Sequence, residues 1–220
     1  MNTNPARAAI LAQIRARQGR PEALRAMEAQ DVEADIARHV RGPQPNLGDD
    51  LVAVFTAQAL SLQTTVAHAA NLHAVPQAVA AYLREQSLEM QGVAWQTLAD
   101  LPWADAGLAL EFRPPRDEDK LGITGCFCAV AETGSLLLAS SPATPASTHL
   151  LPETHVAIVP RSRIVATLED AYALLRAELG ELPRALSTVS GPSRTGDIEQ
   201  TIVLGAHGPY RVHVVLVDAH

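Results

Sequence analysis

Four short apolar runs constrain the fold of this chain more than any other feature of its sequence. Apolar residues follow one another in these runs instead of alternating with polar ones; the runs are CFCAVA (126–131), SLLLAS (135–140), HVAIVP (155–160) and VHVVLV (212–217). Such strands are buried on both faces, as happens when helices cover both sides of a parallel sheet. Helical patterns lie between the runs, and the combination predicts an α/β fold with a mostly parallel sheet and helices on both faces.

Apolar residues at three- and four-residue steps mark the helices of this fold. The stripes predict helices over 51–62, 75–83 and 168–179, the first of them capped by Asp49 or Asp50. Weaker strand signals lie over 64–69, 107–112 and 185–190.

The first forty residues carry a different pattern, in which apolar residues recur at helical steps among arginines and acidic residues. This pattern breaks at RGPQPNLGDD (41–50), a stretch rich in proline and glycine that is typical of a linker. We therefore expect a helical arm over residues 1–45 and one α/β domain over residues 46–220. The arm either packs on the protein or contacts another subunit, and we favour packing.

Composition excludes several classes of protein. The 24 acidic and 17 basic residues leave a net charge of −7, which argues against binding to nucleic acid because that binding depends on Lys and Arg. The two cysteines, Cys126 and Cys128, cannot supply the four ligands of a standard iron–sulfur cluster and lack the spacing of a zinc site. We therefore expect no metal site and no cofactor bound by this chain. The sequence shows no signal peptide and no apolar run of about 20 residues, so we expect a cytoplasmic protein without a transmembrane segment.

The segment SGPSRTGDIEQT (190–201) is the most informative polar stretch. It follows a predicted strand, and Thr195 is placed to cap a helix whose first turn would carry Asp197 and Glu199. A strand end, a small-residue loop and a helix start often hold an anion in an α/β fold. Ser190, Ser193 and Arg194 would supply the donors; the alternative is a well-capped turn with no ligand.

A second polar turn, AETGSLLL (131–138), follows the first apolar run. Glu132 at such a position can act as a nucleophile or a base, Thr133 adds a donor, and Gly134 lets a ligand approach the backbone. Acidic residues at hairpin turns are also common without any catalytic role. Among the histidines, His207 is the candidate ligand-binding residue, because it lies in a loop before the last strand.

Three segments of the C-terminal half resemble the LUD domain family. They are GITGCFCAVAETGSLLL, HLLPETHVAIVPRSRIVATLEDA and SGPSRTGDIEQTIVLGAHGPYRVHVVLVD, and together they span most of residues 107–220. The resemblance implies a fold related to ribose-5-phosphate isomerase, coenzyme A transferases and 5-formyltetrahydrofolate cyclo-ligase. It also implies a part in oxidising L-lactate to pyruvate with two partner proteins, of which one carries iron–sulfur clusters and the other is a cysteine-rich oxidoreductase subunit.

The same resemblance implies a pocket built from both polar turns. Its residues would be Glu132, Thr133 and Gly134 with Ser190, Ser193, Arg194, Thr195 and Asp197. A glutamate in a comparable turn of coenzyme A transferases forms an acyl intermediate, and Glu132 is its positional analogue at the level of the fold. The chain departs from the family pattern at Cys126-Phe127-Cys128 and at Gly196, which leaves a separate role for the thiols open.

Three functions follow from these observations. The first is an accessory subunit of an iron–sulfur system for L-lactate oxidation, which binds a small carboxylate or phosphate through Arg194 and leaves electron transfer to its partners. The second is an independent acyl-transferase, isomerase or cyclo-ligase that uses Glu132 and the loop over 190–195. The third is a scaffold without a ligand, in which the polar residues satisfy loop backbone groups.

Overall fold

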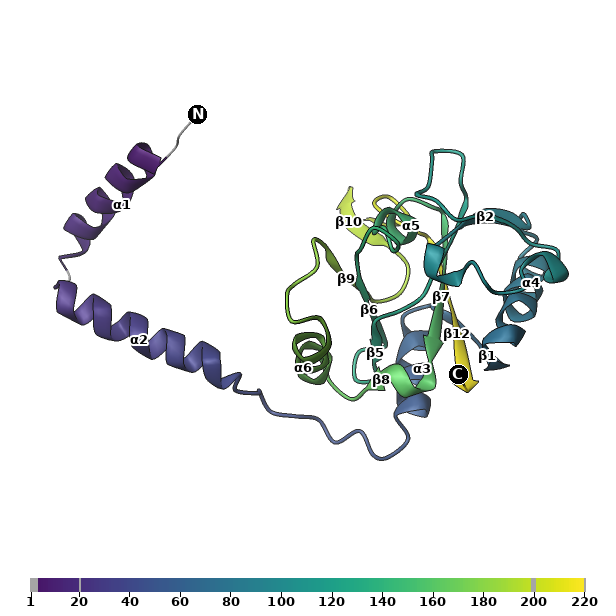
Figure 1. The fold of residues 1–220 in the computed structure, drawn as a ribbon, viewed down its shortest axis with the longest axis horizontal. Helices are drawn as coiled ribbons and strands as arrows, with labels where there is room; N and C mark the ends of the chain where they lie inside the picture. The colour runs from purple at the N-terminus through teal and green to yellow at the C-terminus, as the bar shows by residue number, and fades with distance from the viewer. Residues whose placement is uncertain (1–3, 20, 199–200, 220) are drawn as a thin grey trace. The chain divides into compact units, whose positions relative to one another are not determined.

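The computed structural model describes residues 4–19, 21–198 and 201–219. The chain divides into two units, Met1–Gln44 and Pro45–His220. The first unit holds two helices, α1 (Asn4–Gln18) and α2 (Glu22–Arg38) (Figure 1). At the end of α2, His39 adopts a left-handed backbone conformation, and its N–H bonds to the Ile36 carbonyl at 3.2 Å.

Six strands form the central sheet of the second unit in the order β1-β12-β7-β4-β2-β3. All neighbouring pairs run parallel. The strands are β1 (Thr65–Asn71), β2 (Gln91–Ala94), β3 (Ala109–Glu111), β4 (Leu121–Thr124), β7 (Thr154–Pro160) and β12 (Arg211–Ala219). The apolar runs over 155–160 and 212–217 lie at its centre, as β7 and β12. The predicted parallel sheet and the α/β class are therefore confirmed.

Helices lie on both faces of this sheet (Figure 1); they are α3 (Leu51–Ser61), α4 (Val75–Glu85) and α5 (Ser147–Leu150). On the face that α4 covers, the Tyr82 ring stacks on the ring of His213 in β12, with centroids 3.8 Å apart. Gly122 of β4 pairs with His155 of β7, which in turn pairs with Val212 of β12. Successive residues of a strand point to opposite faces, so Gly122 and Val212 face away from His213 and α4. A Cβ on Gly122 would lie 2.0 Å from the Thr148 carbonyl oxygen, because α5 packs directly against that side.

A second sheet of four strands has the order β8-β5-β6-β9. Its strands are β5 (Cys128–Val130), β6 (Ser135–Ala139), β8 (Ile164–Val165) and β9 (Leu186–Val189). β5 and β6 pair antiparallel, since a connection of a few residues permits a hairpin but no parallel crossover. The outer helix α6 (Leu168–Leu179) packs on this sheet through Ala171 and Leu175. Two of the four apolar runs thus build this smaller mixed sheet, which the sequence did not separate from the larger one.

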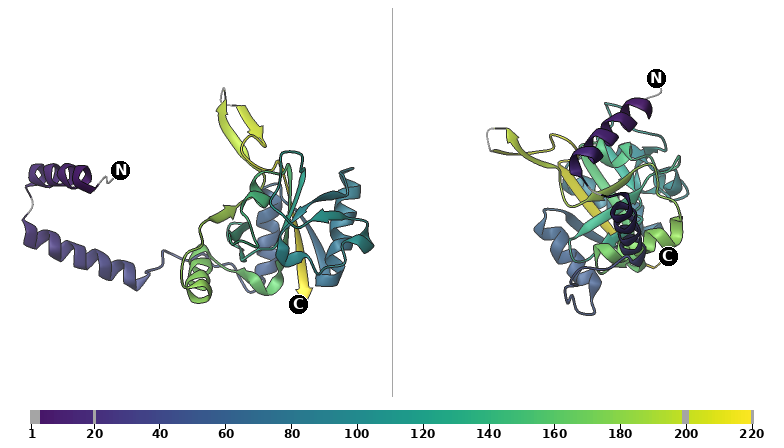
Figure 2. Two further views of the ribbon diagram at one scale, coloured as in Figure 1. Left: turned by 45° about the horizontal axis from the view of Figure 1, so that its top comes forward. Right: turned by 90° about the vertical axis from the view of Figure 1, so that its left-hand side faces the viewer.

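The helix predicted after Thr195 is wrong. The segments β10 (Arg194–Ile198) and β11 (Thr201–Leu204) pair as antiparallel strands. The hairpin that they form projects from the rest of the domain (Figure 2). Thr195, Ile198 and Thr201 are β-branched, and Gly196 is unfavourable inside a helix. These preferences outweigh the capping signal.

Four short 3-10 helices connect the described elements of the domain: η1 (Leu72–Ala74), η2 (Gln96–Leu98), η3 (Ala104–Ala106) and η4 (Arg161–Arg163). In the described part of the chain, no helix combines the length and the apolar character needed to cross a membrane.

Candidate functional site

The two polar turns singled out in the sequence lie side by side. β6 pairs antiparallel with β9, and Leu136 is in register with Val189. This pairing brings the turn before β6 next to the loop after β9, so that the Ser135 and Ser190 hydroxyl oxygens are 2.6 Å apart. Since the turns are 55 residues apart in sequence, only the sheet brings them together. We call residues 132–135, 190–195 and 62–63 the paired-turn site.

Glycines allow both turns to press against the C-terminal end of α3. Gly134 has φ +62°, and a Cβ there would lie 2.6 Å from the Ala59 backbone nitrogen. Gly191 has φ +77°, and a Cβ there would lie 2.5 Å from the Leu62 carbonyl oxygen. Both positions combine a left-handed backbone with a close backbone contact, so a larger side chain is excluded for two reasons.

Glu132 is bound to the start of the outer helix. Its Oε1 accepts the N–H of Leu168, the first residue of α6, at 3.0 Å, and its own N–H donates to the Ala166 carbonyl. A carboxylate at a helix N-terminus satisfies a backbone donor and interacts favourably with the helix dipole. This contact gives Glu132 a positioning role; to act as a nucleophile it would have to leave the Leu168 N–H.

Hydroxyl groups make up most of the remaining polar surface of the paired-turn site. The Thr133 hydroxyl is buried and has no hydrogen-bond partner among the described residues. Ser135 is buried, whereas Ser190 is exposed, so their hydrogen bond links a buried hydroxyl to one that solvent can reach. A buried hydroxyl without a partner carries a desolvation cost that a bound ligand or water would remove.

Arg194 also belongs to the paired-turn site, and its side chain points toward the C-terminal end of α3. Its guanidinium donates to the Leu62 carbonyl at 3.0 Å and to the Gln63 side-chain oxygen at 2.9 Å. A cation is favourable there, because the last carbonyls of a helix have no partner within the helix. Arg194 is exposed, so it can also meet an anion from solvent. Sequence reasoning missed Leu62 and Gln63; the one local signal is the polar Gln63-Thr64 break between helix and strand.

Ser193 and His207 belong to adjoining loops. The Ser193 N–H donates to the Pro209 carbonyl at 2.8 Å, and the Gly205 N–H donates to the Ser193 carbonyl at 2.9 Å. These bonds bring the loop before β12 next to the paired-turn site, and His207 is exposed on that loop.

The remaining predicted site residues lie in the hairpin. Thr195 is buried and in register with Val203 of β11. The backbone of Asp197 belongs to β10, but its side chain lies outside the described part of the structure.

The two thiols are shielded from reaction, Cys128 fully and Cys126 in part. Burial raises the pKa of the Cys128 thiol to about 11, and burial together with the neighbouring Cys128 raises the pKa of the Cys126 thiol still further. The Cys126 Sγ also donates to the Cys128 carbonyl at 2.7 Å. Since the thiolate is the reactive form, both side chains behave as small apolar groups.

We expect the folded protein to resist thiol alkylation. Iodoacetamide at mildly alkaline pH should label both cysteines only slowly, and denaturant should make both labels appear at the rate of free thiols. Mass spectrometry of the intact chain over time measures this. Fast labelling of Cys126 in the native protein would contradict the shielding.

Three buried histidines surround the central sheet. His149 contacts the Trp95 ring edge-on, its ring centroid lies 5.8 Å from that of His155, and the Thr124 hydroxyl lies 2.8 Å from His155 Nε2. His213 bonds to the Thr65 hydroxyl on the other face. Burial lowers the pKa of His149 and His213 to about 4 each; burial, aided by His149, lowers that of His155 to about 3. All three are therefore neutral packing residues at neutral pH.

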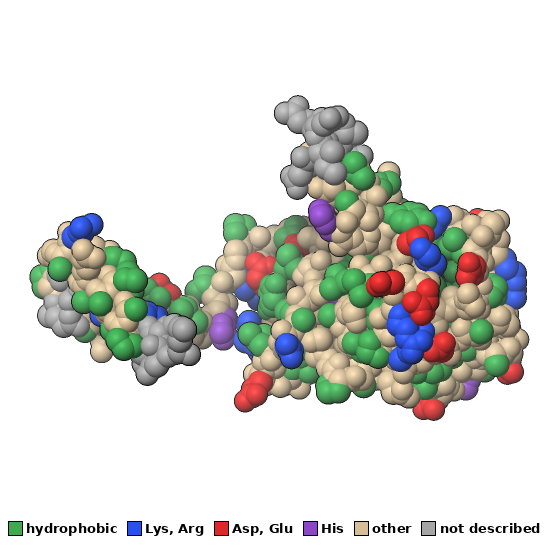
Figure 3. Space-filling model, turned by 90° about the horizontal axis from the view of Figure 1, so that it is seen from above, with side chains coloured by type: hydrophobic (Ala, Val, Ile, Leu, Met, Phe, Trp, Pro, Cys, Tyr) green, Lys and Arg blue, Asp and Glu red, His purple; other side chains and the backbone are tan. Residues whose placement is uncertain are grey.

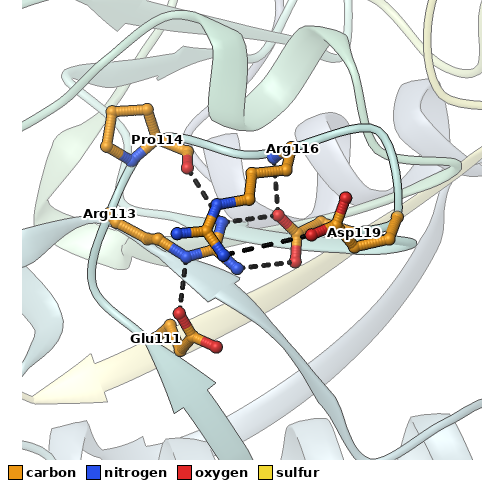
Figure 4. Close-up of polar contacts among 6 residues, drawn as sticks. Glu111, Arg113, Pro114, Arg116 and Asp119 are labelled. Atoms are coloured by element: carbon orange, nitrogen blue, oxygen red, sulfur yellow. Dashed lines mark hydrogen bonds and ion pairs between the residues drawn. The ribbon is translucent and has the colours of Figure 1, made fainter.

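A charged cavity of about 380 Å³ lies elsewhere, along β2, β3 and the loop over 113–120. Arg113 there bonds to both oxygens of Asp119 at 2.7 and 3.2 Å and to Glu111 at 2.5 Å, as Figure 4 shows. Burial would raise the pKa of the Asp119 carboxyl, but its bonds from Arg113 and the Arg116 N–H outweigh this and lower it. Because its charges are paired with one another, this cluster fixes the loop and is a weaker ligand site than the paired turns.

Charges are intermixed on the surface shown in Figure 3. Acidic and basic side chains lie next to each other there and form no extended basic face. This face therefore gives no support to nucleic-acid binding. Within the described ranges, no three His, Cys, Asp or Glu side chains come together as metal ligands.

Comparison with known proteins shows a family relationship in the region that contains the paired turns. Residues 111–217 match the family model of the LUD domain. The "Lactate utilization protein C" of Bacillus licheniformis is 34% identical over 105 residues, which are 46% of this chain and 44% of that protein. The "Lactate utilization protein C 1" of Bacillus mycoides is 42% identical over 101 residues, which are 44% of this chain and 43% of that protein. The match thus spans less than half of each relative.

A solved structure shares the fold over a longer stretch. The crystal structure of a DUF162 family protein from Deinococcus radiodurans superposes with a TM-score of 0.58 and 26% sequence identity. The superposition covers 76% of this chain and 96% of that one.

Proposed function

We propose that the chain belongs to the LUD domain family, whose model matches residues 111–217, and that it acts in lactate utilization. It serves in the cytoplasm as an accessory subunit of an L-lactate oxidation system, and its partners carry the iron–sulfur clusters. The observation that carries the proposal is the place of the paired-turn site: residues 132–135 and 190–195 all lie inside the LUD match over 111–217. The relatives named for lactate utilization supply the pathway.

The paired-turn site has the chemistry to hold a small carboxylate. A guanidinium and two hydroxyls lie at one end of α3, and charge-assisted hydrogen bonds from arginine to a carboxylate are among the strongest in proteins. Arg194 would bind the carboxylate, and Ser135 and Ser190 would bind a neighbouring hydroxyl or carbonyl oxygen. Electron transfer would then fall to the partners, since two cysteines do not ligate a standard cluster.

The enzyme alternative gains less support from the contacts. An acyl intermediate on Glu132 requires a free carboxylate, and Oε1 of Glu132 accepts a bond from the α6 backbone. Its role in the accessory subunit is to hold the turn in place.

Complementation of a deletion strain tests the proposal. We expect loss of the gene to slow growth on L-lactate, the wild-type chain to restore it, and Arg194→Ala to restore it several-fold less well. Arg161→Ala is the matched control, because Arg161 also makes an exposed polar contact, with Asp218 at 2.8 Å. The tagged wild-type chain should also retain the iron–sulfur partners when they are co-expressed.

Unchanged growth of the deletion strain on L-lactate, with no partner retained, would contradict the proposal. Equal growth with Arg194→Ala and Arg161→Ala would remove Arg194 from the function while leaving the pathway in place.

A further inference from the structure

The two helices of the first unit expose large apolar side chains. Ile10, Ile14, Met27, Val32 and Ile36 are between 47% and 64% exposed. Single exposed apolar residues are ordinary, but a series of them along two consecutive helices marks a surface that binds another protein surface. Helices of 15 and 17 residues also depend on such packing, because isolated helices of about this length are marginal in water.

The charges on these helices narrow the choice of partner. α1 contains three arginines and no acidic residue, whereas α2 contains five acidic residues against two arginines. α1 is therefore basic and α2 is acidic.

The charges also lie among the apolar side chains and not on a separate face. Residues four apart lie above one another on a helix. One row of α2 reads Leu24, Glu28, Val32, Ile36, and the adjacent row reads Met27, Asp31, Asp35. On α1, one row reads Arg7, Leu11, Arg15, and the adjacent row reads Ile10, Ile14. A surface that covers α2 must therefore be apolar and basic, and a surface that covers α1 must be apolar and acidic.

A second copy of this chain meets both requirements. We propose that residues 4–38 form a homodimer interface, in which α1 of each copy packs against α2 of the other. A two-fold axis makes both contacts at once, because each copy offers one basic and one acidic helix. The apolar side chains supply the attraction, and the opposite charges select the pairing and exclude α1 against α1.

A charge exchange between two variants tests the proposal on the full chain. One variant carries Arg7→Glu and Arg15→Glu, and the other carries Glu28→Lys and Asp31→Lys. Each variant alone would place like charges against each other across the interface, so it should elute with the mass of one chain at micromolar concentration. The wild type should elute with the mass of two chains. When the two variants are mixed in equal amounts, the acidic α1 of the first variant meets the basic α2 of the second, and the unchanged α1 and α2 meet each other. The mass of two chains should therefore return. Light scattering after size exclusion measures the masses, and circular dichroism checks that each variant is helical.

A matched pair of apolar substitutions tests the packing separately. Ile36→Glu should weaken dimerisation by about tenfold or more, and Leu151→Glu, at a residue of the second unit that is also 64% exposed, should leave it unchanged.

Several results would overturn the proposal. They are a wild type that stays monomeric at all concentrations, single variants that remain dimeric, and folded variants that fail to associate when mixed. A monomer whose two helices pair within one chain would also give no mixed dimer.

Discussion

The free energy of unfolding should fall by about 5 kcal/mol between pH 7 and pH 5. His149, His155 and His213 are buried and have pKa values of about 4, 3 and 4 in the folded chain. In the unfolded chain a histidine has a pKa of about 6.5. Between these pKa values the unfolded state binds protons that the folded state does not bind. The stabilising contribution of the three histidines is therefore complete above pH 6.5 and decreases as the pH falls toward 4. Each histidine contributes up to about 1.4 kcal/mol per pH unit, and a domain has only about 5–15 kcal/mol in total.

Urea unfolding followed by tryptophan fluorescence at a series of pH values measures this dependence. His149→Phe should reduce the slope of stability against pH by about one third, because one of three proton-binding sites is lost. Its stability at pH 7 should change little, since neither ring nitrogen of His149 has a hydrogen-bond partner among the described residues.

Thr148→Val is the matched control for the acid effect. Thr148 is buried next to His149 on α5, and its hydroxyl also has no partner among the described residues. The substitution can shift stability at every pH, but it removes no titrating group and should leave the slope unchanged. A stability that is flat between pH 6.5 and pH 5 would contradict the assignment of the histidines as neutral buried groups.

The sequence predicts local structure in this chain well where a single physical signal dominates. Asp50 caps α3 by accepting the Ala53 N–H at 3.0 Å, and the apolar runs at β7 and β12 lie at the centre of the parallel sheet. It fails after Thr195, where a hydroxyl before two acidic residues resembles a helix start. There the β-branched residues favour strands, Gly196 disfavours a helix, and pairing with β11 decides the outcome.

Local sequence patterns identify the residues of the candidate site but not their assembly into one pocket, which only the resemblance to the LUD domain family implies. Small and polar residues at strand ends identify Glu132, Ser190 and Arg194 from the sequence alone. Their convergence depends on the pairing of β6 with β9, and the place of Arg194 depends on the end of α3, more than 130 residues earlier. Such contacts follow from how sheets and helices pack, which no local pattern encodes. The buried pair of His149 and His155 is of the same kind, since α5 and β7 bring the two rings together.

Replacement of Gly134 by alanine should lower the free energy of unfolding by about 3 kcal/mol or more. Two costs add at this position. The backbone has φ +62°, which costs a residue with a Cβ about 1–2 kcal/mol. The new methyl group would also lie 2.6 Å from the Ala59 nitrogen and 2.7 Å from the Gln58 carbonyl carbon. These are backbone atoms of a packed helix, so they cannot move away from the new methyl group as the end of a flexible side chain could.

Gly107→Ala separates the two costs. Gly107 also has a left-handed backbone, with φ +81° and ψ +20°, but a Cβ there would have no atom within 4 Å, so we expect a loss of about 1 kcal/mol. Chemical denaturation of both variants at pH 7 gives the comparison, and the difference between them measures how tightly the turn is held against α3. Equal losses would mean that the turn can move away from α3. In that case the contacts that place Ser135 beside Ser190 would not be rigid, and the paired-turn site would lack the fixed geometry that carboxylate binding requires.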